Sequence, residues 1–259
     1  MLSKIYYFSG TGNCLATARK INENSLYKNE IISIPSVISK PLIKADRVGL
    51  VFPVYCHKVP KLVEQFLMKA EFASSPYIYA VATHAGAVGQ SLFDVQNLFE
   101  KKNQSLSLGI ELAMPGNAIA IAPGIEIERL SSLEQRAAEI AKLTDIQSKG
   151  HIDGNNGITE NIRNKIVDLI AYKYIFAPKR FKITGNCTGC GICEKICPVN
   201  NIRMVESKPI WGNDCAACLA CFHWCPKEAV YMSNSVIGKR RKYHHPDISV
   251  SDMIQANGC

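Results

Sequence analysis

The sequence predicts an α/β protein in two parts, a doubly wound parallel sheet of five strands followed by a small α+β domain. Two observations lead to this fold class. Over residues 1–150, short apolar runs alternate with longer amphipathic stretches, as parallel strands joined by crossover helices require. Over residues 180–236, eight of the chain's eleven cysteines fall into two runs with the same spacing, so a second unit is expected there.

The expected strands of the first domain are five apolar runs, over residues 4–8, 31–34, 48–52, 77–82 and 105–112. Helical periodicity predicts the intervening helices over residues 13–23, 61–72, 88–101 and 131–148. Pro60 stands at the start of the second helix, where proline is favoured. Five strands with their helices in about 150 residues fit a doubly wound domain better than a barrel.

Two further segments flank the cysteine-rich domain. A polar, glycine-rich stretch over residues 150–157 breaks the pattern, and helical spacing then predicts a helix over residues 159–176. Residues 151–179 are therefore expected to form a connector helix and linker. Residues 237–259 are a basic C-terminal tail. Its basic run at residues 239–242 either docks an acidic redox partner or is solvated or folded back on the protein.

The arrangement of the cysteines indicates the compartment. Clustered cysteines point to bound metal in a reducing cytoplasm, and not to the disulfides of a small secreted chain. The N-terminus lacks the charged and apolar regions of a signal peptide, and the most apolar long window, residues 106–125, is broken by two prolines and a glutamate. We expect a cytoplasmic protein without membrane insertion.

The two cysteine runs share the pattern Cys-x2-Cys-x2-Cys-x3-Cys-Pro and repeat with a period of 28 residues. This is the run of bacterial ferredoxins, in which three cysteines of one run and the last cysteine of the other hold each 4Fe-4S cluster. We assign one cluster to Cys187, Cys190, Cys193 and Cys225, and the other to Cys215, Cys218, Cys221 and Cys197. Zinc knuckles or a disulfide knot are the alternatives, but zinc sites do not predict a fourth cysteine followed by proline in both runs.

Other residues of the two runs have expected roles around the clusters. The small residues Gly189, Gly191, Ala216 and Ala217 are expected to let the loops curl until backbone N–H groups reach the sulfur atoms. His223 and Trp224 lie between cysteines of the second run. We expect both to shield a cluster, with proton coupling at His223 as the alternative.

A hydroxyl- and glycine-rich turn follows the first predicted strand and precedes the first predicted helix. It consists of Ser9, Gly10, Thr11, Gly12 and Asn13. Such a turn directs backbone N–H groups and the positive end of the helix at an anion. The dinucleotide fingerprint is not met, because Leu15 stands where its third glycine would be. Hydroxyl and amide side chains without a lysine indicate a terminal monophosphate.

The first domain resembles the flavodoxin family, whose first loop binds the phosphate of FMN. The resemblance implies that two later loops, each after a predicted strand, border the flavin ring: Pro53, Val54 and Tyr55, and Thr83, His84, Ala85 and Gly86. Tyr55 would stack on the ring, with plain packing as the alternative. Cys56 and His57 follow in place of the acidic, aromatic-rich stretch of many flavodoxins, so one flavin face is expected to be open or covered by the second domain.

As a whole, the chain resembles flavodoxin–ferredoxin fusion proteins. The resemblance implies an electron-transfer protein that relays electrons between two 4Fe-4S clusters and FMN, and on to redox partner proteins, in anaerobic metabolism. One alternative is an FMN-dependent reductase of a small molecule, fed by its own clusters. Another is a ferredoxin with an apo flavodoxin-like docking domain. An electron carrier is favoured over a flavin-dependent oxidoreductase.

The charge of the chain bears on its partners. The formal charge of +8 falls to about +2 once two clusters, at roughly −4, and a flavin phosphate, at roughly −2, are counted. The basic run at residues 239–242 has no nucleic-acid recognition motif around it. We therefore expect no nucleic-acid partner, and the sequence leaves a homodimer open.

Overall fold

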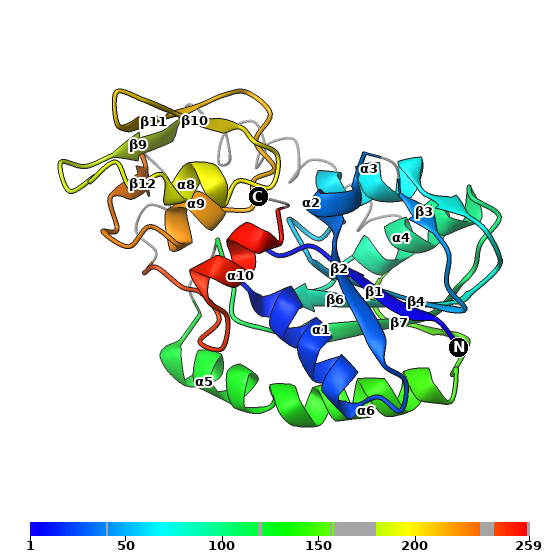
Figure 1. The fold of residues 1–259 in the computed structure, drawn as a ribbon. Helices are drawn as coiled ribbons and strands as arrows, with labels where there is room; N and C mark the ends of the chain where they lie inside the picture. Colours follow the sequence, from blue (N-terminus) through cyan, green and yellow to red (C-terminus); the bar gives the residue numbers. More distant parts are fainter. Residues whose placement is uncertain (40, 119–120, 156, 158–179, 234–240, 258–259) are drawn as a thin grey trace.

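The computed structural model describes residues 1–39, 41–118, 121–155, 157, 180–233 and 241–257 (Figure 1). The predicted helix over residues 159–176 lies outside the described residues, and so does the first part of the basic tail. Within the described part of the chain, no helix has the length and apolar character needed to cross a membrane.

The first domain is built on one parallel sheet, with strands in the order β2-β1-β4-β6-β7-β8. The strands are β1 Ser3–Tyr7, β2 Asn29–Ser33, β4 Arg47–Pro53, β6 Tyr77–His84, β7 Leu106–Ala113 and β8 His151–Ile152. The central strands are buried on both faces, as expected for a parallel sheet between two helical layers. The first five strands have the flavodoxin-like order, so the predicted fold class is confirmed.

The sheet differs from the prediction at one edge. A short sixth strand, β8, pairs with β7 in the segment that was expected to be a polar break, and the sheet therefore continues past residue 150. Asp153 explains the local order, because its carboxylate accepts the N–H of Glu111 on β7 and its own N–H donates to Gly109 O. A separate pair of two-residue strands, β3 Leu42–Ile43 and β5 Glu71–Phe72, lies outside this sheet.

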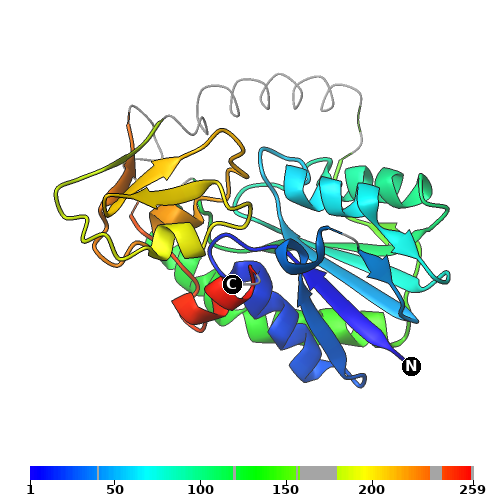
Figure 2. The ribbon, with the colours of Figure 1, turned by 45° about the horizontal axis from the view of Figure 1, so that its top comes forward.

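Helices cover both faces of the sheet (Figures 1 and 2). One layer contains α1 Asn13–Asn24, α5 Pro123–Ser131 and α6 Leu133–Asp145, and the other contains α2 Ile34–Val37, α3 Lys61–Lys69 and α4 Ser91–Glu100. The single helix predicted over residues 131–148 is thus the shorter α6, and α5 precedes it. Pro123 near the start of α5 suits the first turn of a helix, and this signal was missed.

The cysteine-rich domain consists of two short hairpin-like pairs and two short helices. Strands β10 Ile202–Val205 and β11 Lys208–Trp211 pair antiparallel, as do β9 Phe181–Ile183 and β12 Val230–Met232. The helices α8 Ile192–Lys195 and α9 Ala220–His223 occupy matching places in the 28-residue repeat. The domain sits at the edge of the sheet where the parallel strands end (Figure 1).

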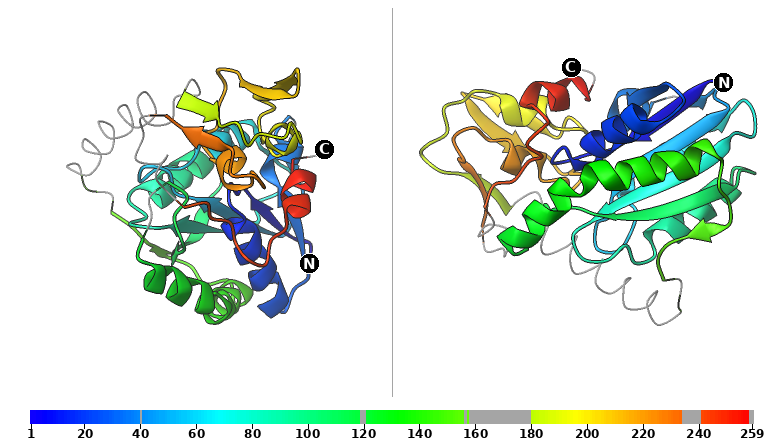
Figure 3. Two further views of the ribbon diagram at one scale, coloured as in Figure 1. Left: turned by 90° about the vertical axis from the view of Figure 1, so that its left-hand side faces the viewer. Right: turned by 90° about the horizontal axis from the view of Figure 1, so that it is seen from below.

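Residues 241–257, called the tail from here on, run back along the first domain. They end in α10 Val250–Gln255, which lies beside α1 and the cysteine-rich domain (Figure 3). Of the basic run, Arg241 pairs with Glu126, and the Lys242 ammonium lies 3.1 Å from the Phe222 ring centroid and donates to Val230 O. The Lys242 side chain is therefore folded back on the protein, whereas the Arg241 side chain remains 76% exposed although it pairs with Glu126. Docking of a redox partner at this run stays a prediction.

Candidate functional site

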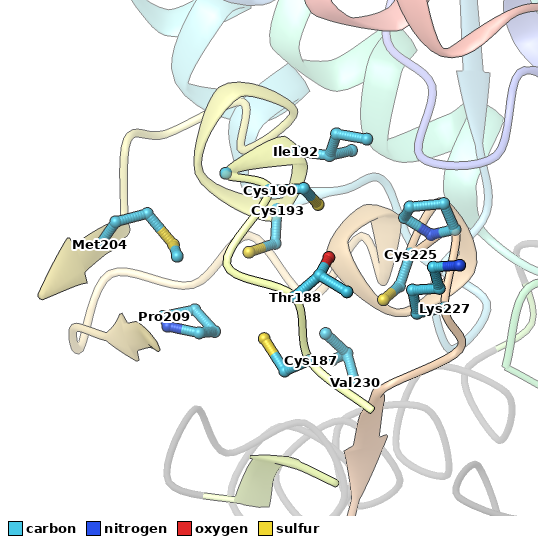
Figure 4. A pocket seen from close by; sticks show the side chains of 12 residues that line it. Cys187, Thr188, Cys190, Ile192, Cys193, Met204, Pro209, Cys225, Lys227 and Val230 are labelled. Atoms are coloured by element: carbon cyan, nitrogen blue, oxygen red, sulfur yellow. The ribbon is translucent and has the colours of Figure 1, made fainter. Parts of the chain in front are cut away.

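Four cysteines from both runs surround one cavity in the second domain (Figure 4). Cys187 and Cys190 come from the loop that leads into α8, Cys193 lies in α8 itself, and Cys225 follows α9. The structure thus brings together the first of the two ligand sets predicted by the crossed arrangement. Within the described part of the chain, no group of three or more His, Cys, Asp or Glu side chains is placed to hold a single metal ion.

The electrostatic interactions between the thiols divide the cysteines into the same two sets. Burial, and then the neighbouring thiols of the same set, raise the pKa of Cys193 to about 11. Burial likewise raises the pKa of Cys221 well above its usual range, and the thiols that add to the effect belong to Cys218, Cys215 and Cys197. Each group of neighbours equals one predicted ligand set. With their raised pKa values, Cys193 and Cys221 would lose their protons when a metal binds.

The backbone of each cysteine loop curls as expected. Gly189 and Gly191 have positive φ angles of 69° and 75°, and their counterparts in the second run, Ala217 and Leu219, have 56° and 60°. A left-handed conformation is costly for a leucine, so strain is accepted at the second loop. Backbone N–H groups reach three sulfur atoms: Asn201 donates to Cys197, Ala217 to Cys215 and Ala229 to Cys225, at 3.2–3.4 Å.

The Ser9–Asn13 turn has the donors that an anion needs. Gly12 precedes α1 with a φ of 94°, which favours glycine. The Ser9 hydroxyl oxygen accepts the N–H groups of Gly12 and Cys14. Among the described residues, no acceptor binds the backbone N–H groups of Gly10, Thr11 and Asn13, although all three residues are buried. Unpaired buried N–H groups at a helix start fit a phosphate.

One expectation for this turn changes in the structure. The Asn13 side chain was expected to offer hydrogen bonds to the phosphate, but both ends of its amide have protein partners. Its nitrogen donates to Pro115 O at 2.8 Å, and its oxygen accepts the Tyr243 hydroxyl at 2.6 Å. The main chain of Asn13, rather than its side chain, is therefore what remains for an anion.

The other two predicted loops lie beside this turn at the same edge of the sheet. Val54 N–H donates to Thr83 O at 2.8 Å, and the Thr83 hydroxyl is 3.2 Å from Cys14 Sγ. Burial lowers the pKa of His84, and the facing Glu111 opposes that shift. The structure thus gathers all three loops that sequence reasoning selected, Ser9–Asn13, Pro53–Tyr55 and Thr83–Gly86.

Tyr55 and the two residues after it form a tight turn. The Tyr55 ring is buried and meets the Phe8 ring edge-on at 6.3 Å, which fits the packing alternative. Tyr55 and Lys58 exchange two backbone hydrogen bonds, and the residues between them, Cys56 and His57, both have positive φ, at 52° and 67°. Two consecutive non-glycine residues in this conformation store strain at the loop.

The second domain contacts the Ser9–Asn13 turn directly. The Trp224 indole donates to Gly10 O at 3.0 Å, and a β-carbon on Gly10 would lie only 2.2 Å from Cys218 O. Asn117 joins the contact, because its amide donates to Cys218 O and its carbonyl faces His223 Nε2 at 2.7 Å. Sequence reasoning missed Asn117, because no local pattern around a loop residue indicates a hydrogen bond to Cys218, 101 residues away.

Comparison with known proteins supports the second domain most directly. Residues 186–230 match the family model described as a 4Fe-4S dicluster domain. No curated protein matches the chain significantly.

Solved structures similar to the first domain include two flavodoxins and an azoreductase. A Megasphaera elsdenii flavodoxin is 20% identical over 53% of this chain and 99% of its own, with a TM-score of 0.33. A Streptococcus pneumonia TIGR4 flavodoxin is 18% identical over 55% and 99%, with a TM-score of 0.37. An azoreductase from Bacillus anthracis str. Sterne is 9% identical over 54% and 99%, with a TM-score of 0.40.

Proposed function

We propose, from a flavodoxin-like sheet joined to a 4Fe-4S dicluster domain, that this chain relays electrons between two 4Fe-4S clusters and FMN and passes them to a redox partner protein. One observation carries the proposal. The Gly10 backbone of the candidate phosphate turn touches the Cys218 backbone of a candidate cluster loop. Two redox sites in contact through main-chain atoms suit direct electron transfer between them.

The residues that would hold each cofactor follow from the two ligand sets and the three loops. Cys187, Cys190, Cys193 and Cys225 would bind the outer cluster, and Cys215, Cys218, Cys221 and Cys197 the inner cluster. The N–H groups of Gly10, Thr11 and Asn13 would bind the flavin phosphate. When bound, the clusters supply one-electron transfer, and FMN supplies one- and two-electron transfer.

The two cluster sites differ in what they face. Cys190 of the outer set is exposed, whereas Cys218 and Cys221 of the inner set are buried, and Cys218 adjoins Gly10. The outer site is therefore suited to exchange electrons with a partner protein. The inner site is suited to exchange them with the flavin. This order gives the two clusters separate tasks along one route.

Cofactor content is the first test. Protein purified without oxygen should hold about eight irons and eight acid-labile sulfides per chain, from two 4Fe-4S clusters. Flavin released by acid should be FMN, in about one equivalent, because the turn suits a single terminal phosphate. Stoichiometric zinc without sulfide, or FAD in place of FMN, would contradict the cofactor assignments.

Rapid mixing with a one-electron reductant tests the relay itself. The clusters should be reduced first, and the flavin in a later phase whose rate does not depend on protein concentration, because the domains are in contact. Transfer between separate molecules would instead accelerate as the protein is concentrated. A flavin that stays oxidised while both clusters are reduced would leave the independent-carrier and apo-docking alternatives.

A further inference from the structure

The tail lies against the candidate phosphate turn through its own backbone and side chains. His245 N–H donates to Thr11 O at 2.8 Å, and the Tyr243 hydroxyl donates to Asn13 Oδ1 at 2.6 Å. Ile248 packs on Gly12, where a β-carbon would lie 3.0 Å from the Ile248 Cβ. Residues more than 200 positions apart in the chain thus meet at the turn.

These contacts use acceptors of the turn and spare its donors. Thr11 and Asn13 each give the tail an oxygen, while their backbone N–H groups have no acceptor among the described residues. The tail therefore does not compete with an anion for the turn. Instead, it holds the peptide groups in the orientation in which their N–H groups remain available to a phosphate.

The tail is itself anchored on both domains. On the first domain, Arg19 pairs with Asp252 at 2.5 Å, and Met253 is buried in the main core. On the second domain, Tyr243 N–H donates to His223 Nδ1 at 3.0 Å, and the His244 ring stacks on Trp224 at 4.3 Å. Ser249 starts α10 with a capping box, which fixes where the helix begins.

We infer that the tail is part of the flavin site, and that Tyr243 is a positioning residue that orders the phosphate-binding turn by fixing Asn13. The inference rests on the proposed function. The Asn13 amide is held between Tyr243 and Pro115 O, so the first residue of α1 has one orientation before any ligand arrives. A turn that is already ordered loses less conformational entropy on binding, and affinity rises accordingly.

The direct test is the affinity for FMN of Tyr243→Phe, measured by quenching of flavin fluorescence on apo-flavin protein with its clusters intact. Loss of one hydrogen bond in the positioning contact should weaken FMN binding by about tenfold. Tyr77→Phe is the matched control, because it also removes one hydroxyl hydrogen bond, to Ser148 O at 2.8 Å, at the start of β6. The control should bind FMN within about twofold of wild type, and both variants should keep their iron and sulfide.

Hydrogen exchange supplies a readout that a general loss of stability would not produce. Because coupling between two sites is reciprocal, FMN should slow exchange of the His245 amide in wild type and do so less in Tyr243→Phe. Equal FMN affinity in wild type and Tyr243→Phe, or a His245 amide indifferent to FMN, would overturn the inference alone. A wild-type protein that binds no flavin would overturn the proposed function, and with it the role of the tail.

Discussion

At Gly10 the two domains meet without an intervening side chain. The carbonyl oxygen of Cys218 occupies the space that a β-carbon would take, and Trp224 binds the Gly10 carbonyl from the same domain. The φ angle of Gly10 is not positive, so its backbone conformation does not demand a glycine. Glycine is required here because the Cys218 backbone approaches so closely. A methyl group at this position would therefore first meet the Cys218 backbone.

Gly10→Ala should therefore separate the turn from the inner cluster loop. We expect it to lower the free energy of unfolding by about 1–3 kcal/mol, as overpacking does, and to slow the flavin phase in rapid mixing. Gly124→Ala is the control, because outside its chain neighbours and its own helix backbone nothing lies within 4 Å of a β-carbon placed there. Denaturant unfolding and stopped-flow spectra measure both effects. An unchanged rate of flavin reduction in Gly10→Ala would show that electrons do not pass through this contact.

A second residue-scale prediction concerns the crossed ligand sets. Cys197→Ser should damage the inner cluster, whose other ligands are Cys215, Cys218 and Cys221, although Cys197 belongs to the first run. Electron paramagnetic resonance of the reduced protein should then retain the outer cluster signal. Loss of the outer cluster alone would instead support ligation within each run.

His223 illustrates what residue patterns predict and what they leave open. Its place between two cysteines suggested either shielding or proton coupling. In the structure, Nδ1 accepts Tyr243 N–H and Nε2 faces Asn117 O at 2.7 Å, an arrangement that requires the neutral ring. This fits shielding. Both partners are distant in sequence, so no local pattern contained the answer.

At the scale of elements, periodicity and turn chemistry predicted what depends on neighbours in sequence. The five main strands, the start of α1 at Asn13 and the start of α3 at Lys61 agree with the prediction. The sixth strand was missed because His151 and Ile152 carry no strand pattern and pair only through the exposed edge of β7. The return of the tail was left undecided, since its burial comes from Ile248 and Met253 meeting a core formed elsewhere.

Attachment of the tail should depend on pH through His245. Burial lowers the pKa of His245. The nearby Asp247 carboxylate opposes this shift, and His244 adds to it. A detached tail takes up a proton on His245 below about pH 6.5, whereas the attached tail resists it, so attachment weakens as pH falls below that value. Protease cleavage in the tail, followed from pH 8 to pH 5, should rise accordingly. In His245→Asn, the rise should flatten.

The cap of α10 gives an element-scale test of a different kind. Ser249 accepts the N–H of Asp252, and the Asp252 carboxylate accepts the Ser249 N–H in return. Ser249→Ala should cost about 1 kcal/mol of local stability. Hydrogen exchange of the α10 amides should accelerate about fivefold, while exchange in the central strands β4 and β6 stays unchanged. Equal acceleration in the central strands would mean that α10 has no local unfolding step.

Across the whole molecule, the main hydrophobic core crosses the boundary between the two domains, although the second domain also has a smaller core of its own. Ile196, Cys218 and Trp224 of the second domain lie in the same cluster of buried side chains as Phe8 and Leu15 of the first. Metal binding would order the cysteine loops further, so order in the second domain would be coupled to order in the first. Separate domains on a flexible linker would lack this coupling.

Removal of the clusters should consequently weaken flavin binding. Chelation under anaerobic conditions frees the loop that carries Cys218, and the Gly10 contact is lost with it. We expect FMN affinity to fall by about tenfold, which fluorescence titration before and after reconstitution of the clusters would measure. Identical affinities would mean that the flavin site is complete without the second domain.

The hydrogen bond between Tyr243 and Asn13 also implies an order of events during synthesis of the chain. The two residues are 230 positions apart, so the ribosome finishes the phosphate turn roughly ten to fifty seconds before it makes the residue that holds it. During that interval the phosphate turn lacks its contact with Tyr243, and the cysteine loops are still being synthesised. On the proposed function, the tail would close on the turn only after both domains have been synthesised, and bound FMN would exchange more slowly from then on.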